Sequence, residues 1–453
     1  MHGENGGTLT IDAPGSDGDH EFKVPYITRV EGEGSLSLTV RGGEVVDARL
    51  KIFEAPRYFE RLVVGRTGDE TLDIVARICG ICPIAYQMSA VHAFEDLYGI
   101  EVDPQVRALR RVLYCGEWIQ SHALHVFMLH APDFLGYPSA LAMAADHREI
   151  VEQGLAIKKV GNQLISAIGG RPIHPVSVRV GGFSRAPRKA DLEDVRHALD
   201  AAVEHARATV RLVATWTPPE LDNPQPLVAM RHPAEYPFND GRIVSTDGLD
   251  IAPQAWGTRF EELHLEGTNA LHARTRDGEV YLLGPTARIA LTAETLHPLA
   301  FEALTETGLR DAIRVNIHRS IVARSVELLH SLAEARDLID GYVPPSEPRV
   351  AFTPSPGIAA WSTEAPRGLL HHRYEVDERG HVVHAQIVPP TSQNQGAIEA
   401  DLAAFAPTVL GLPHAEATHQ HEMLIRAYDP CISCATHCLD LRIVEAGRGE
   451  GKT

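Results

Sequence analysis

Two short cysteine motifs at opposite ends of the chain constrain this sequence most. Cys79 and Cys82 form one Cys-x-x-Cys pair, and Cys431 and Cys434 form the other. Two thiolates at this spacing can bind one metal ion, and folding that joins both pairs would make a four-sulfur site. Such a site requires the first and last parts of the chain to meet in one body.

The spacing alone leaves four kinds of site open. Structural zinc sites usually join cysteine pairs that lie within about 20 residues of each other. A chain of 453 residues is large enough to fold without a metal ion that stabilises it. Ferredoxin-like clusters draw on short local runs of cysteines. Six cysteines without a secretion signal do not indicate a disulfide framework. A catalytic metal centre where two distant segments meet is the fourth possibility.

Composition excludes several classes of partner. Hydrophobic residues make up 44% of the chain, enough for a large core, yet no run of about 20 apolar residues could span a membrane. The net charge of −18 argues against nucleic acid, whose binding requires a basic face. Free thiols and the lack of a signal segment predict a cytoplasmic location. Residues 1–23 are expected to be a disordered lead-in, because the stretch is rich in small and polar residues.

Hydrophobic periodicity predicts a mainly α fold with α+β elements. Residues 24–53 alternate apolar and polar side chains around a turn, as paired strands do. Residues 218–284 resemble an appendage of strands and loops, and residues 374–390 a hairpin. The helical period recurs in six segments, residues 69–98, 103–130, 141–168, 189–216, 293–303 and 309–339. These helices would form a long bundle that encloses the metal site, with small antiparallel sheets at the periphery.

The residues around the cysteine pairs are more specific than the pairs themselves. Residues 77–83 read RICGICP, and residues 429–437 read DPCISCATH. Both resemble the signature motifs of the nickel–iron hydrogenase large (catalytic) subunit, and the resemblance extends over residues 24–437. Residues 29–34 and 78–92 are similar to the cytosolic bidirectional subgroup linked to NAD(P), the sulfhydrogenase alpha-like proteins.

The resemblance implies the metals and the reaction. The reaction would be the reversible oxidation of H2 to protons and electrons. Nickel would be held by Cys79, Cys82, Cys431 and Cys434. Of these, Cys82 and Cys434 would bridge to an iron that carries carbon monoxide and cyanide ligands.

The same resemblance assigns residues next to the metals. Glu60 and His437 would bind a magnesium ion beneath the active site, although Glu60 could equally be an ordinary carboxylate on a helix surface. Thr391, which follows Pro390 in the sequence, would donate a hydrogen bond to an iron-bound cyanide.

Acid–base roles follow from the resemblance as well. Glu31 would carry protons to and from a metal-bound cysteine, although a solvated surface turn is the plain alternative. The proton released from H2 would go to the Cys434 sulfur or to Arg367, whose guanidinium would lie over the metals. Asp133 and Asp429 would fix Arg367 in place.

The electrons need partners outside this chain. It has too few cysteines for a relay of clusters, and it lacks the Gly-x-Gly-x-x-Gly fingerprint of dinucleotide-binding domains. An iron–sulfur small subunit is therefore the expected obligate partner, followed by flavin- and nicotinamide-binding diaphorase subunits that hold FAD and NAD(P). Nickel-insertion factors would load the site. A maturation endopeptidase would then remove residues 438–453 and leave a single domain of residues 24–437.

Two other functions share this ancestry. The quinone-site subunit of respiratory complex I is a structural relative, but it lacks the four metal cysteines present here. A hydrogen sensor would keep the site and turn over slowly, and it normally lacks an extension such as residues 438–453.

Overall fold

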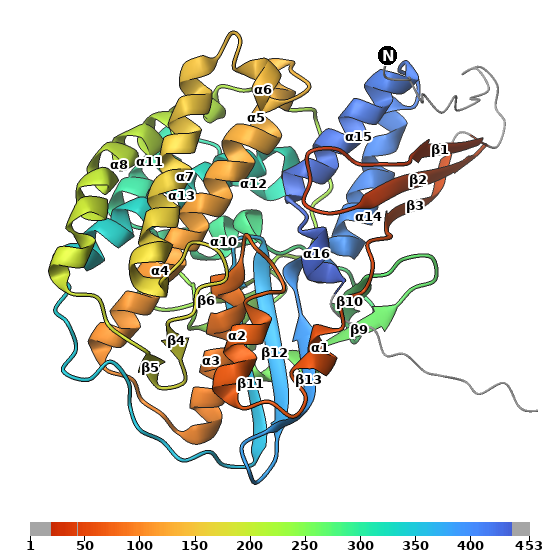
Figure 1. The fold of residues 1–453 in the computed structure, drawn as a ribbon. Coiled ribbons are helices and arrows are strands. Elements are labelled where there is room, and N and C mark those ends of the chain that lie inside the picture. Colours follow the sequence, from red (N-terminus) through yellow and green to blue (C-terminus); the bar gives the residue numbers. More distant parts are fainter. Residues whose placement is uncertain (1–19, 43, 437–453) are drawn as a thin grey trace, which may run out of the picture.

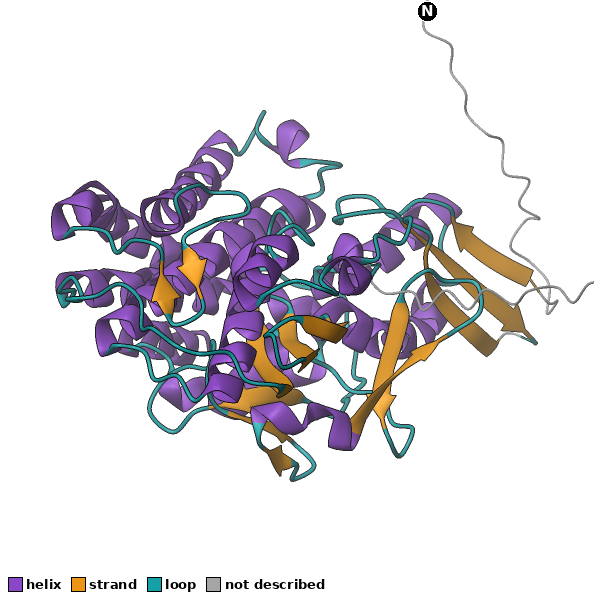
Figure 2. Cartoon of the chain, turned by 60° about the horizontal axis from the view of Figure 1, so that its bottom comes forward, coloured by secondary structure: helices purple, strands orange, loops and turns teal. Residues whose placement is uncertain are grey.

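The computed structural model describes residues 20–42 and 44–436 of the chain. Within this part, helices dominate, and five small antiparallel sheets lie around and between them (Figures 1 and 2). The predicted fold class is thereby confirmed. Residues 1–19 of the predicted lead-in 1–23 and the predicted extension over residues 438–453 lie outside the described residues. Residues 20–23, which were expected to be disordered, belong to strand β1 (His20–Val24).

Long helices packed side by side form the half of the molecule drawn on the left in Figure 1. They are α4 (Pro104–Ala123), α7 (Arg148–Gly169), α8 (Glu193–Ala214), α11 (Pro298–Thr307) and α13 (Ser320–Asp340). α4 packs against α7 and α13, and α13 also packs against α8 and α11. Their buried faces form a large hydrophobic core that includes the cysteines of both motifs. The metal motifs therefore belong to the core of the bundle, as the sequence predicts.

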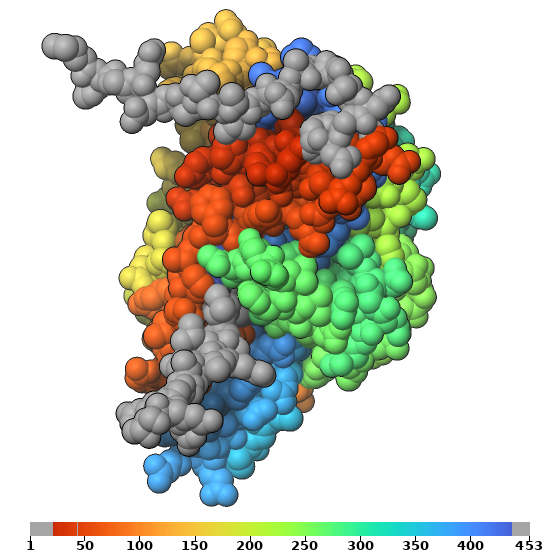
Figure 3. All heavy atoms as spheres, turned by 90° about the vertical axis from the view of Figure 1, so that its right-hand side faces the viewer, coloured from red at the N-terminus to blue at the C-terminus, as the bar shows by residue number. Residues whose placement is uncertain are grey.

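The other half combines sheets with shorter helices. The sheet of β11 (Gly357–Ala365), β12 (Gly368–Val376) and β13 (Val382–Val388) packs on α3 (Pro83–Tyr98). The N-terminal sheet of β1 (His20–Val24), β2 (Gly34–Arg41) and β3 (Glu44–Ile52) packs on α14 (Pro390–Val409), which contacts α15 (His414–Tyr428). In Figure 3 the N-terminal sheet, in red, adjoins the green segment of β9 (Phe260–His264) and β10 (Leu271–Thr275).

The remaining elements are short. The short strands are β4 (Val178–Arg179), β5 (Gly182–Phe183), β6 (Val228–Arg231), β7 (Arg242–Ser245) and β8 (Asp250–Ile251). The short helices are α1 (Phe59–Leu62), α2 (Gly68–Val75), α5 (Ala131–Leu135), α6 (Ala140–Met143), α9 (Trp256–Arg259), α10 (Pro285–Thr292), α12 (Arg310–Val315) and α16 (Ile432–Ala435). Single turns are η2 (Lys189–Leu192), η3 (Pro253–Ala255), η4 (Ala293–Thr295) and η5 (Ile317–Arg319).

Several predicted helices are interrupted, among them the segments 69–98, 309–339 and 103–130. The segment 69–98 divides into α2 and α3, because Pro83 can begin a helix but not continue one, and Cys82 before it is not helical (φ −117°, ψ 39°). The segment 309–339 breaks at Asn316, whose side chain accepts a hydrogen bond from the His318 amide at 3.0 Å. The segment 103–130 is α4 followed by a π-helical stretch, η1 (Leu124–His130). Within the described residues, no helix is both long and apolar enough to cross a membrane.

The crossing of α4 and α7 depends on glycine. A Cβ atom at Gly161 would lie 2.6 Å from the Gly116 carbonyl oxygen and 2.7 Å from the Gln120 amide nitrogen. We therefore expect Gly161→Ala to lower the free energy of unfolding by about 1–3 kcal/mol. Gly411→Ala is the control, because a Cβ there meets nothing within 4 Å. Denaturant unfolding of the purified chain measures both, and an unchanged midpoint for Gly161→Ala would contradict the packing.

Candidate metal centre

The two cysteine pairs meet in the interior. Cys79 and Cys82 lie in the segment between α2 and α3, and Cys431 and Cys434 lie at and within α16. The sulfur atoms of all four lie within 4.8 Å of one another, and all four residues are buried. Each member of the first pair faces one of the second, with 3.4 Å between the Cys79 and Cys431 sulfurs and 3.4 Å between those of Cys82 and Cys434.

An N-terminal segment holds the second pair in place. Glu31 and Cys431 form a parallel bridge, in which the Ile432 amide donates to the Glu31 carbonyl at 2.9 Å. Gly32 makes this contact possible, because it has φ +90° and a Cβ there would lie 2.6 Å from the Ile432 Cβ. The Arg57 amide donates to the Thr436 carbonyl at 2.9 Å. The C-terminal motif is therefore bound to residues that precede the first motif.

The surroundings shift the pKa values of the cysteine thiols in different directions. Hydrogen bonds from Cys431, Cys434 and Cys82 hold the pKa of the Cys79 thiol well below its usual value. The Ile81 and Cys82 amides also donate to the Cys79 sulfur, at 3.3 and 3.4 Å. Burial raises the pKa of Cys82. Four soft sulfur ligands in a closed, buried cluster suit a cation such as nickel or zinc, whose charge would favour the thiolate form of each.

Glu31 lies against one of these sulfurs. Its Oε2 accepts hydrogen bonds from the Cys431 thiol at 3.2 Å and from the Ser433 amide at 3.0 Å. Sequence reasoning placed Glu31 beside a metal-bound cysteine and gave the proton to the Cys434 sulfur or to Arg367. The contact that the structure gives Glu31 is with Cys431.

Arg367 is buried on another side of the cluster. Its Nη2 donates to Asp429 Oδ1 at 3.0 Å, its Nε to the Asp429 carbonyl at 2.8 Å, and its Nη1 to Ser121 Oγ at 3.3 Å. Burial opposes the positive charge. Asp429 and the cysteine sulfurs outweigh burial and hold the pKa of Arg367 above its usual value. The predicted contact between Asp429 and Arg367 is present.

The predicted contact between Asp133 and Arg367 is wrong. Asp133 accepts from Arg426 Nε at 2.9 Å and Nη2 at 2.8 Å, and it also pairs with Arg29 at 2.5 Å. Asp133 lies on α5, beyond the π-helical turn of η1, where α15 and the N-terminal segment supply these two arginines. Its carboxylate therefore joins three distant segments next to the site and does not hold Arg367.

A second acidic site lies near the C-terminal motif. Glu60 Oε1 accepts from the Ile387 amide at 2.7 Å. Burial and the neighbouring charge of Glu60 raise the pKa of Glu262 to about 8. The Glu262 Oε2 accepts from Gln386 at 2.8 Å, whereas its Oε1 is buried without a hydrogen-bond partner. Both side chains are only partly exposed, and two neighbouring carboxylates favour a cation between them. The other predicted ligand, His437, lies outside the described residues.

Thr391 supports the second cysteine pair directly. Its Oγ1 accepts from the Cys431 amide at 3.0 Å, and Pro390 before it is the first residue of α14. The hydroxyl hydrogen of Thr391 is therefore not used in this bond and remains to be donated.

Sequence reasoning missed the side chains that support the first cysteine pair. Glu117 on α4 accepts from the Ile84 amide at 2.5 Å and the Ala85 amide at 3.1 Å, which caps the start of α3 immediately after Cys82. Arg57 donates from its Nη2 to the Ile78 carbonyl at 2.7 Å. The one available signal was that Glu117 is a charged residue within an apolar helical stretch.

Comparison with known proteins places this arrangement in a family. A family profile described as nickel-dependent hydrogenase matches residues 57–158 and 286–437. The chain is 34% identical over 423 residues to sulfhydrogenase 2 subunit alpha of Pyrococcus furiosus, covering 93% of this chain and 100% of that one. It is 28% identical to the NAD-reducing hydrogenase HoxS subunit beta of Cupriavidus necator, covering 92% and 94%.

A solved structure has the same fold. The crystal structure of an NAD+-reducing nickel–iron hydrogenase in the H2-reduced state aligns with a TM-score of 0.83 at 26% identity. The alignment covers 92% of this chain and 99% of that chain, so the likeness extends over both halves of the molecule.

The hydrogen bond between Thr391 and Cys431 can be tested by substitution. Thr391→Val keeps the shape of the side chain but leaves the buried Cys431 amide unpaired, which should cost about 1–3 kcal/mol of unfolding free energy. Thr391→Ser retains the hydroxyl and is the matched control. Denaturant unfolding of the two variants measures the difference, and equal midpoints would show that the amide does not depend on Thr391.

Proposed function

Because this chain belongs to the nickel-dependent hydrogenase family, as a catalytic large subunit, we propose that Cys79, Cys82, Cys431 and Cys434 hold its nickel–iron centre. The observation that carries the proposal is the meeting of these four buried sulfurs from the two ends of the chain. Cys82 and Cys434 would be the two shared between nickel and iron. A nickel–iron pair whose iron carries carbon monoxide and cyanide would act on H2 as a Lewis acid and accept its electrons.

The chain's own residues would then handle the proton. Cys431 is the sulfur in contact with Glu31 Oε2, at 3.2 Å, so we assign the transfer to Cys431 in place of Cys434. Glu31 is partly exposed, whereas the sulfurs are buried, and its carboxylate can therefore pass the proton from the interior towards solvent.

Arg367 would orient H2 and not accept its proton. The pKa of Arg367 is held above its usual value by Asp429 and the sulfurs, so the guanidinium stays charged at any working pH. Its Nε and Nη2 are both held by Asp429. Because the Arg367 charge is fixed beside the sulfurs, it would polarise a bound H2 molecule, and the guanidinium would not have to reorganise during the reaction.

We also propose two groups around the centre. Glu60 would bind magnesium together with His437, and the support in the described residues is the buried, unpartnered Glu262 oxygen beside Glu60. Thr391 would donate its hydroxyl hydrogen to a cyanide on the iron, since its oxygen already accepts from the Cys431 amide.

The electrons would pass to an iron–sulfur small subunit. Of the five cysteines in the described residues, four form the centre and the fifth, Cys115, is buried apart from them. Gly80, between the two cysteines of the first pair, is exposed, and Ile173, 55% exposed, would lie 3.9 Å from a Cβ at Gly80. This surface lies directly at the first motif, and we propose it as the docking face.

The wider assembly follows the NAD-reducing relatives. Diaphorase subunits with FAD would pass the electrons to NAD(P) in the cytoplasm. Nickel-insertion factors would load the centre, and an endopeptidase would cut after His437.

Cys434→Ser tests the metal assignment. The variant should lose H2 oxidation to below detection in the assembled complex and carry less nickel per chain, because one sulfur ligand is gone. Cys115→Ser is the control, since Cys115 is equally buried and lies outside the cluster. Hydrogenase assays with metal analysis measure both, and full activity in Cys434→Ser would refute the assignment.

Glu31→Gln tests the proton route. The amide keeps the shape of the side chain but cannot shuttle a proton, so nickel content should be normal while exchange between D2 and solvent protons falls at least about 100-fold. Glu33→Gln, two residues away and exposed, removes the same charge and should exchange normally. Mass spectrometry of the evolved gas follows the exchange. Normal exchange in Glu31→Gln would remove Glu31 from the route.

A further inference from the structure

A cluster of buried charged side chains packs next to the backbone segment that leads into Arg367. Arg288 on α10, Glu327 on α13 and Glu364 on β11 are all 0% exposed. Arg288 donates to both Glu327 oxygens, from Nε at 2.7 Å and from Nη2 at 2.8 Å, and from Nη1 to Glu364 Oε2 at 2.8 Å. Burying such charges costs desolvation energy that their attraction barely offsets, so stability alone is a weak reason for the cluster.

Arg288 also holds the backbone that leads into Arg367. Its Nη1 donates to the Ala365 carbonyl at 3.1 Å and its Nη2 to the Pro366 carbonyl at 2.9 Å. These two carbonyls immediately precede Arg367 in the chain. One guanidinium therefore binds two carboxylates and two main-chain oxygens at once.

The turn at Arg367 also packs tightly against the start of α10. A Cβ at Gly284 would lie 2.8 Å from the Arg367 carbonyl oxygen, and one at Gly368 would lie 3.0 Å from the Gly284 amide nitrogen. Both glycines have positive φ, +100° and +133°. The backbone at Arg367 is thus confined in two ways. Gly284 packs closely against it, and the hydrogen bonds from Arg288 hold the two residues that precede it.

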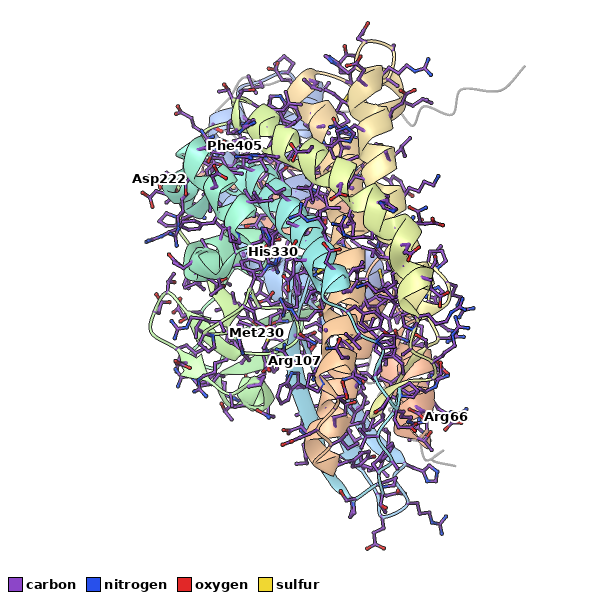
Figure 4. All side chains as sticks on the ribbon, turned by 90° about the vertical axis from the view of Figure 1, so that its left-hand side faces the viewer. Arg66, Arg107, Asp222, Met230, His330 and Phe405 are labelled. Atoms are coloured by element: carbon purple, nitrogen blue, oxygen red, sulfur yellow. The ribbon has the colours of Figure 1, made fainter. Side chains whose placement is uncertain are left out.

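The carboxylates of the cluster are themselves fixed. Glu327 accepts from Tyr236 at 2.7 Å and pairs with His122 at 3.0 Å, and Glu364 accepts from the Met230 amide at 2.7 Å. Met230 on β6 is labelled in Figure 4, as is His330, which lies one turn of α13 beyond Glu327. The Arg288 guanidinium also lies 4.2 Å from the ring centroid of Trp118. Arg288 is therefore held directly by α4, α13 and β11, and through Glu364 by β6.

We propose that Arg288 is a positioning residue for Arg367. By binding the carbonyls of Ala365 and Pro366, it sets where the Arg367 guanidinium lies beside the cysteine sulfurs, and it touches neither the sulfurs nor Asp429. This inference rests on the function proposed for Arg367. Lysine cannot replace it, because an ammonium is a point charge with three donors and lacks the planar fork that reaches five acceptor oxygens.

Arg288→Lys tests the proposal in the assembled holoenzyme, because it keeps the charge that the two carboxylates need. The control is Arg110→Lys. Arg110 is equally buried, it binds Glu95 with two bonds of 2.6 Å, and its other hydrogen bonds go to the Arg179 and Gly182 carbonyls. Arg288→Lys should lower kcat for H2 oxidation at least about tenfold, since small displacements of an orienting group are costly. Nickel content and the infrared bands of the iron ligands should stay unchanged, and Arg110→Lys should change kcat less than about twofold.

A double variant distinguishes positioning from general damage. If Arg288 acts through Arg367, then Arg288→Lys combined with Arg367→Lys should be no slower than Arg367→Lys alone. Losses that multiply would overturn the positioning role. Normal kcat in Arg288→Lys beside a slow Arg367→Lys would overturn it while leaving Arg367 in the mechanism. Normal kcat in Arg367→Lys would overturn the role of Arg367 and this inference with it.

A second substitution covers the case in which Arg288→Lys does not assemble. Glu364→Gln removes one carboxylate charge from Arg288 and keeps the shape of the side chain. It should lower kcat in the same direction by a smaller factor, and its loss should vanish in the Arg367→Lys background. A normal kcat for Glu364→Gln would contradict the proposal.

Discussion

The structure depends on the meeting of four buried sulfurs from two ends of one chain. That meeting is secured by main-chain hydrogen bonds, above all the bond from the Ile432 amide to the Glu31 carbonyl. Gly32 has to be a glycine for the two segments to approach this closely. The same contact places the Glu31 carboxylate against the Cys431 sulfur, so one interaction both builds the centre and gives it an outlet for protons.

The molecule also buries charged side chains around the centre. Thiolates, carboxylates and guanidinium groups are all costly to bury, and here they compensate one another. Arg367 is stabilised by Asp429 and the sulfurs, and Arg288 by Glu327 and Glu364. A charge held in this way cannot reorganise freely, which is the condition for electrostatic assistance to a reaction. The long helix α13 carries Glu327, and the other charged groups lie on β11, on the short helix α10 and in the segments that follow β11 and α15.

The parts of this account that the sequence predicted are those with a local signature. Helical periodicity located the long helices, and the cysteine spacing with its neighbours located the centre, because both are properties of adjacent residues. The break before Pro83 was missed because an apolar period continues through the cysteine segment. The partners of Asp133 could not be predicted, since Arg29 and Arg426 come from opposite ends of the chain. Arg288 gave no functional signal for the same reason, and the only signal of Glu117 was its charge within an apolar helical stretch.

The central claim is that these sulfurs hold a nickel–iron centre. The most direct measurement is the infrared spectrum of the complex purified anaerobically from its native host, together with its nickel and iron content and the mass of this chain. The account predicts bands from metal-bound carbon monoxide and cyanide, with nickel present. Zinc at the four cysteines and no such bands, in a chain whose mass shows that it ends at His437, would contradict it.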